Sequence, residues 1–169
     1  YMYNVGKGTA KNLKEAFKWY KRAADQGNSK GQYAIGYAYQ WGEGVDQDYA
    51  KALKWFKLAS NQQHPVAQFG IGVLYQYGDG VEQNYLEAMK WYKLASNKEP
   101  LATFQVGVLY ETGGYGVDKN YEEAMKWYTL ADKQGYDEAS NAIGVMYEYG
   151  KGVEQNYVEA LKWYRWGAA

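Results

Sequence analysis

The chain has 169 residues, and its 19 lysines and arginines balance its 19 aspartates and glutamates, so its formal charge at pH 7 is zero. A neutral chain lacks the basic surface with which proteins hold polyphosphate, which disfavours nucleic-acid binding. Without cysteine it can form neither a disulfide framework nor a thiolate metal site. The longest apolar run, 69–75, contains two glycines and falls well short of the roughly 20 residues of a membrane span, so we expect a soluble chain.

The sequence predicts short helices separated by glycine-rich turns. Residues 13–25 carry apolar side chains at the spacing of one helix face and lysines on another. From residue 30 a pair of helices follows: helix A, at about 30–41, and helix B, at about 49–60. Gly42 suits the left-handed conformation that ends a helix, and Asp48 is placed to cap helix B. The same capping place is taken later by Asn84, Asn120 and Asn156.

This helix pair recurs at a fixed spacing. Tryptophans stand 36 residues apart at Trp19, Trp55, Trp91, Trp127 and Trp163, and glycines do so at Gly44, Gly80, Gly116 and Gly152. Such a period indicates stacked supersecondary units. We therefore expect one array over 1–169, with a partial repeat at 1–29 and repeats at 30–64, 65–99, 100–135 and 136–169. The chain opens inside a helix at Tyr1, so we expect it to be cut from a longer protein of unknown compartment.

The large rings of helix B are expected to pack between helices. Each tryptophan lies one turn before an alanine or glycine, which favours packing over a ladder that stacks a ligand. Helix A carries a glycine at one equivalent site in every repeat, where a Trp or Tyr ring of helix B could approach closely. These glycines are Gly36, Gly72, Gly107 and Gly144.

The whole repeat pattern is legible in Ala67, Ile71, Gly72, Tyr75, Gly78, Gly80, Val81, Asn84, Glu87, Ala88, Trp91, Tyr92 and Ala95. It resembles the Sel1-like repeat family, relatives of the tetratricopeptide repeats, over essentially the whole chain. The resemblance implies an all-α fold, a right-handed α/α superhelix (solenoid) of antiparallel helix pairs with helix A on the concave side. It also implies a scaffold or adaptor without catalytic activity.

A second stripe on helix A, opposite the buried one, supplies candidate partner-binding residues. Successive repeats would tile a groove of aromatic, amide and carboxylate groups, and aromatics in a groove are typical anchors for a protein or peptide. The candidates are Tyr33, Tyr37, Gln40 and Trp41, then Phe69, Val73, Gln76 and Tyr77, then Phe104, Val108 and Glu111, then Asn141, Val145, Glu148 and Tyr149.

Some of these candidates have an alternative interpretation. The rings of Tyr33, Phe69 and Phe104 could equally pack against the adjoining repeat. The amides and carboxylates are expected to face the groove, because such groups are rarely buried unpaired.

No pattern points to catalysis, a cofactor or a metal. His64 is the only histidine, which excludes a metal site built on two histidines and a serine or cysteine triad, and we expect it to be solvated in its loop. The glycines at 78–80 predict a turn rather than a phosphate loop, because the next helix begins only behind Asn84. We therefore predict that the chain is not an enzyme.

The leading hypothesis is a non-enzymatic interaction module that binds a partner protein or peptide on helix A. The alternative is a structural spacer or an array that associates end to end through uncapped ends. RNA recognition by helical repeats is less favoured, because the net charge is zero.

Overall fold

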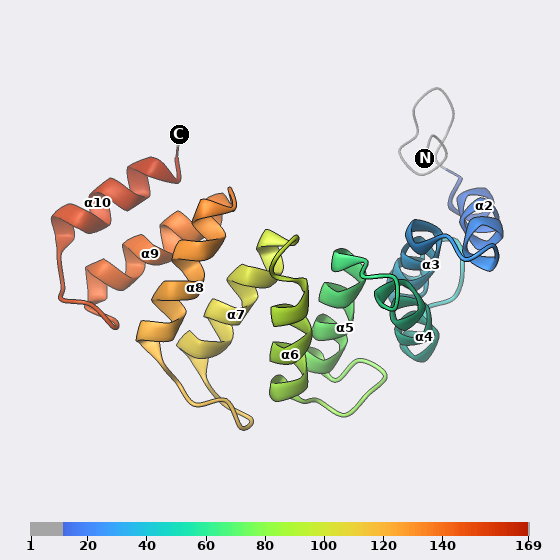
Figure 1. Ribbon diagram of the computed structural model, residues 1–169, viewed down its shortest axis with the longest axis horizontal. Coiled ribbons are helices and arrows are strands. Elements are labelled where there is room, and N and C mark those ends of the chain that lie inside the picture. The colour runs from blue at the N-terminus through green and yellow to red at the C-terminus, as the bar shows by residue number, and fades with distance from the viewer. Residues whose placement is uncertain (1–11, 169) are drawn as a thin grey trace. The chain divides into compact units, whose positions relative to one another are not determined.

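The computed structural model describes residues 12–168, which form nine helices and no strand (Figure 1). The helices are α2 (Leu13–Asp25), α3 (Ser29–Trp41), α4 (Tyr49–Ser60), α5 (Pro65–Tyr77), α6 (Tyr85–Ala95), α7 (Pro100–Thr112), α8 (Tyr121–Lys133), α9 (Asp137–Tyr149) and α10 (Tyr157–Trp166). They group into two compact units, the first ending at Asn84 with α2 to α5 and the second beginning at Tyr85 with α6 to α10.

Consecutive helices pair in antiparallel fashion. At one end of α3 and α4 the backbone N–H of Asp48 donates to the carbonyl of Tyr39 at 2.9 Å. At the other end the ring of Tyr33 stacks on that of Phe56, with centroids 5.9 Å apart. The end of α3 thus meets the start of α4, as helix A and helix B of one repeat should. The all-α fold of antiparallel helix pairs predicted from the sequence is confirmed.

The helix ends follow the predicted local signals. The side chains of Asp48, Asn120 and Asn156 accept hydrogen bonds from the backbone N–H three residues on, which satisfies one of the free donors of each helix B. Gly42 adopts φ +69° at the end of α3, a left-handed conformation that a residue with a side chain enters only at a cost.

A glycine of helix A lies directly against an aromatic ring of helix B. A Cβ added to Gly36 would lie 2.5 Å from Cδ1 of Phe56, and one added to Gly107 would lie 2.6 Å from Cδ1 of Tyr128. Both rings are 1% exposed. Phe56 also packs against the next helix A, since a Cβ on Gly70 would lie 3.0 Å from its ring. The missing side chain is what brings the two backbones together.

The tryptophans of helix B are less buried than the sequence suggested. Trp19 is 53% exposed, and the indoles of Trp55, Trp91, Trp127 and Trp163 are half-buried. Of the two rings expected against the helix A glycines, tryptophan or tyrosine, the tryptophan is not the one that lies there. The next residue takes that role, because one step along a helix turns a side chain by about 100°, enough to move it from the edge of the buried stripe to its centre.

Substitution of Gly36 by alanine tests the close approach of the helices. The added methyl group would collide with the ring of Phe56, so we expect the free energy of unfolding to fall by about 1–3 kcal/mol although alanine favours helix. Urea denaturation measures the change. In a Phe56→Leu background the penalty should shrink, because the smaller side chain leaves room. A Gly36→Ala variant more stable than its parent would contradict the packing.

Candidate functional site

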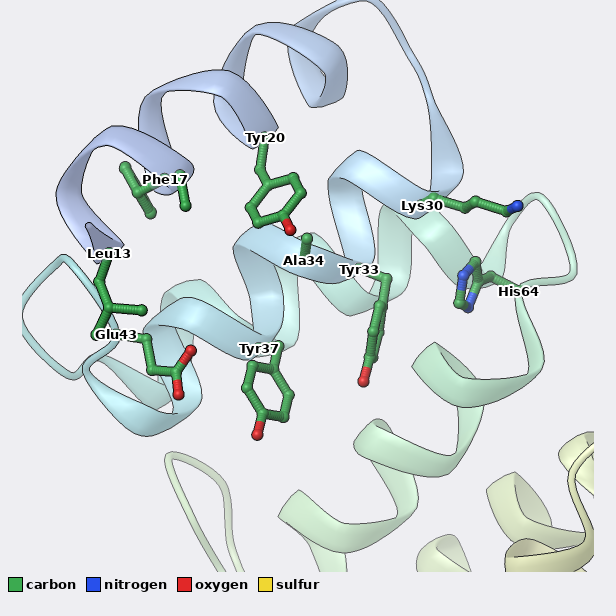
Figure 2. A pocket seen from close by; sticks show the side chains of 10 residues that line it. Leu13, Phe17, Tyr20, Lys30, Tyr33, Ala34, Tyr37, Glu43 and His64 are labelled. Atoms are coloured by element: carbon green, nitrogen blue, oxygen red, sulfur yellow. The ribbon is translucent and has the colours of Figure 1, made fainter. Parts of the chain in front are cut away.

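The first unit contains a pocket of about 710 Å³ between α2 and α3, closed on one side by the residue before α5 (Figure 2). In Figure 2 the rings of Tyr33 and Tyr37 extend from α3, and Tyr20 of α2 reaches toward Ala34. The lining residues are Leu13, Ala16, Phe17, Tyr20, Lys30, Tyr33, Ala34, Tyr37, Glu43 and His64. The pocket is therefore largely apolar and aromatic, with Lys30 and Glu43 as charged groups on it.

An aromatic row runs along α3 from this pocket. Tyr33 and Tyr37 have ring centroids 6.1 Å apart, and Tyr37 and Trp41 have centroids 6.3 Å apart. These residues follow one another at four-residue steps, which place side chains on one face of a helix. Tyr37 is 38% exposed and Trp41 60% exposed. We call Tyr33, Tyr37 and Trp41 the α3 aromatic row; all three were candidates from the sequence.

His64 belongs to the pocket, so the expectation that it is merely solvated is wrong. Its ring stacks on Tyr33 with centroids 5.0 Å apart, and its Nδ1 accepts a hydrogen bond from the backbone N–H of Ala67 at 3.3 Å, which caps α5. Burial, and secondly the charge of Lys30, lower the pKa of His64 below its ordinary value. The structure thus uses a neutral imidazole as the helix cap.

The carboxylates predicted to face a groove are engaged inside the helix pairs. Glu111 accepts hydrogen bonds from the hydroxyl of Tyr128 at 2.7 Å and from Nζ of Lys151 at 2.8 Å. Burial alone would raise the pKa of Glu111, but these two bonds outweigh it and the pKa lies below its ordinary value. Glu148 accepts from the hydroxyl of Tyr164 at 2.5 Å. Both carboxylates tie helix A to helix B.

Gln40 is 6% exposed, so the expectation that it faces the groove is wrong. It occupies the same place in α3 as Glu111 does in α7, at the contact with helix B. Every wholly buried side-chain nitrogen or oxygen in residues 12–168 has a hydrogen-bond partner. An amide suits this place, because it can be buried without the cost of a charge.

The remaining candidates divide by exposure. Tyr77 and Tyr149 are 66% and 64% exposed, and Asn141 is exposed as well. The others are half-buried: Phe69, Val73, Gln76, Phe104, Val108 and Val145.

Phe104 packs against the adjoining repeat, as the alternative interpretation allowed. Its ring centroid lies 5.1 Å from that of Tyr128 in its own repeat and 5.0 Å from that of Tyr136, the residue before α9. Tyr33 makes the equivalent contact with His64, the residue before α5. Sequence reasoning missed these two loop residues; the signal was their shared place immediately before a helix A.

Two kinds of site find no support in the described part of the chain. No group of three or more histidine, cysteine, aspartate or glutamate side chains within residues 12–168 could hold a metal ion. None of the helices over the same range is both long and apolar enough to cross a membrane.

Antiparallel helix pairs repeated along the chain define an α/α repeat protein. The Sel1 repeat model matches five segments, 1–28, 29–64, 65–99, 100–136 and 137–168, so the chain belongs to the Sel1 repeat family. Among curated proteins, none matches this chain.

Solved structures show the same fold. A Sel1 repeat protein from Oxalobacter formigenes is 38% identical with a TM-score of 0.92, over 99% of this chain and 69% of that chain. The protein c5321, a protective antigen of uropathogenic Escherichia coli strains with an SLR fold, is 32% identical with a TM-score of 0.89, over 99% of this chain and 36% of that one. The immunity protein Pa5087 from Pseudomonas aeruginosa is 25% identical with a TM-score of 0.63, over 94% and 59%.

The cap at His64 predicts a pH dependence of stability. Since the pKa of His64 is lowered in the folded chain, the unfolded chain takes up the proton first, and stability should fall as the pH drops through the ordinary value of 6.5. Urea denaturation at a series of pH values from about 7.5 to about 5 measures it.

The matched control is His64→Asn, because asparagine caps α3 in the same way at Asn28 and does not titrate. This variant should lose the dependence on pH near 6.5 and keep the cap, so that its stability at neutral pH falls only by the loss of the ring contact with Tyr33. An equal dependence in both proteins would rule out the histidine as its source.

Proposed function

We propose that this chain is a non-enzymatic interaction module that holds a partner protein or peptide on the exposed side of helix A. Sel1 repeat proteins are generally modules of protein interaction, which supports the general class. The pocket in the first unit and the α3 aromatic row that leads out of it are the docking surface on which the proposal rests.

The α3 aromatic row is the observation that carries this proposal. Rings that project from one rigid helix supply a large apolar area at little cost in conformational entropy, which is why tyrosine and tryptophan dominate binding energy at interfaces. Tyr33 is held by its contacts with Phe56 and His64, so this end of the row is ordered before a partner arrives. A preformed surface binds more tightly than one that must be ordered on binding.

Charge contributes less to the proposed docking than apolar contact. The pocket presents one cation, Lys30, and one carboxylate, Glu43, so it has no net sign with which to select a partner. The chain as a whole is likewise neutral. An apolar or aromatic side chain of the partner, inserted between Tyr20 and Tyr37, is therefore the expected anchor.

Each unit offers further exposed side chains on helix A. In the first unit Tyr77 ends α5 as Trp41 ends α3, and it extends the proposed surface. In the second unit the partner contacts are the exposed Asn141 and Tyr149 and the half-buried Val145 of α9, with the half-buried Phe104 and Val108 of α7. Gln40 is left out because it is buried, and Glu111 and Glu148 contribute only through their remaining exposed surface.

The double substitution of Tyr37 and Trp41 by serine tests the proposal. Both side chains are exposed, so we expect the melting temperature to change little while capture of the partner from native lysate falls at least tenfold, as loss of two interface anchors should cause. Quantitative mass spectrometry of the captured proteins measures the effect.

The matched control replaces Leu94 and Leu130 by serine, since they are 53% and 41% exposed on helix B. This control should capture the partner as the parent does. Capture that survives in the Tyr37 and Trp41 variant would reject the α3 surface.

End-to-end association is a second candidate function, and α10 favours it. Tyr157 and Leu161 are 62% and 56% exposed, whereas Tyr121 and Met125, at the same places in α8, are half-buried. The next repeat covers α8, as the position of Gly152 against Tyr121 illustrates. An apolar helix face of this kind associates readily with another.

Light scattering over a concentration series tests this second function. We expect the apparent mass to rise with concentration and Leu161→Lys to hold the chain as a monomer, because a charge is costly to bury at an apolar contact. Leu94→Lys, at an exposed site elsewhere on helix B, should behave as the parent. A parent chain that stays monomeric at every concentration would remove this candidate.

A further inference from the structure

At two tryptophans of helix B, Trp55 and Trp127, a lysine ammonium lies near the indole, although that of Lys93 also donates to the hydroxyl of Tyr110 at 3.0 Å. Nζ of Lys21 lies 5.3 Å from the centre of the Trp55 ring, and Nζ of Lys93 lies 5.7 Å from that of Trp127. In both cases the lysine stands 34 residues before the tryptophan, on the helix B of the preceding repeat. An ammonium over an indole face is an attractive cation–π contact. Two repeats thus place a lysine ammonium at the indole of the following helix B.

At Trp163, the last of the tryptophans spaced 36 residues apart, this lysine is missing. The residue 34 positions before Trp163 is Thr129, whose side chain is too short to reach the ring. Its hydroxyl donates instead to the carbonyl of Met125 in its own helix, at 2.8 Å.

A pocket of about 370 Å³ lies at Trp163, within the second unit between α8 and α10. It is lined by Asp132, Glu159, Lys162, Trp163 and Trp166. Two of these residues, like Thr129, differ from the residues at the equivalent places of the earlier repeats. Asp132 stands where earlier repeats have Ser60 and Ser96, and Trp166 stands where they have leucine, at Leu58, Leu94 and Leu130. Two departures from the repeat, Asp132 and Trp166, therefore line the pocket at Trp163, and the third, Thr129, stands one turn before Asp132 on α8.

The charges of the pocket favour a cation. Nζ of Lys162 pairs with Glu159 at 2.5 Å, and α8 has the same pair between Lys126 and Glu123 at 2.6 Å, so these two charges cancel. Asp132 adds a negative charge that the equivalent serines lack. The hydroxyl of Ser140 donates to Oδ1 of Asp132 at 2.5 Å and holds the carboxylate in place, while a carboxylate can accept further hydrogen bonds.

We propose that this pocket binds the side chain of a lysine from a partner protein. The incoming ammonium takes the place over Trp163 that the chain's own lysines take over Trp55 and Trp127, and it lies beside Trp166 and Asp132. The site is independent of the docking surface on α3, because all its residues lie on α8 and α10. A negative result for lysine binding at this pocket can therefore be told apart from a negative result for the proposed docking on α3.

Titration of the isotope-labelled chain with Nα-acetyl-lysine amide tests the site. The indole N–H signals of Trp163 and Trp166, assigned by substitution with phenylalanine, should shift on addition of this probe. The uncharged analogue Nα-acetyl-norleucine amide should bind about twofold to thirtyfold more weakly, the range that a cation–π contact accounts for. Equal binding of the two probes would overturn the proposal.

A second set of variants introduces the residues that the other repeats have at the equivalent places. The fold already accepts those residues there, so the variants should fold. Thr129→Lys should fill the site from within and abolish the shifts caused by the lysine probe, whereas Thr129→Ser, which leaves the pocket open, should bind as the parent does. Asp132→Ser and Trp166→Leu should each weaken binding at least twofold. A Thr129→Lys variant that binds the probe as well as the parent, with an unchanged melting temperature, would refute the assignment.

Discussion

The contact between a glycine of helix A and an aromatic ring of helix B is the constraint on which each helix pair depends. Gly36 with Phe56, Gly107 with Tyr128 and Gly144 with Tyr164 all leave less room than one methyl group would need. Glycine destabilises the helix at this site, but its close contact with a large ring stabilises the helix pair and offsets that cost. Since this contact sets the rotation of helix A, it also decides which side chains face outward, and the α3 aromatic row projects as a result.

Much of the fold could be predicted because its signals are local. Left-handed glycine at Gly42 and a capping side chain at Asp48 act within a few residues, so the sequence pattern located the helix ends well. Because the pattern repeats along the chain, a correct prediction of one helix pair was also a correct prediction of the others. The candidate rings Tyr37 and Trp41 were found for the same reason, since four-residue spacing on one helix places them on one face.

The rest could not be predicted, because it depends on small rotations and on neighbouring repeats. Moving the buried stripe by one residue exchanges the roles of Trp55 and Phe56, and periodicity alone does not resolve a single step of a helix. Gln40 and Glu111 were assigned to the surface because polar groups are costly to bury, yet Gln40 is buried as an uncharged amide and Glu111 pairs with Tyr128 across the helices. His64 reaches Tyr33 from a loop thirty-one positions along the chain, a contact with no signature in the local pattern.

The polar partners at the helix A and helix B contact also limit how such an array can change by recombination. Two pairs join a tyrosine hydroxyl of helix B to a glutamate of helix A, Tyr128 to Glu111 and Tyr164 to Glu148, whereas the first pair combines Gln40 with Phe56. A hybrid that joined α7 to α4 would place the carboxylate of Glu111 against a phenyl ring that has no hydrogen to donate. The unit that can be exchanged without losing these contacts is therefore the whole helix pair. Crossovers in the gene should be tolerated between helix pairs rather than inside them.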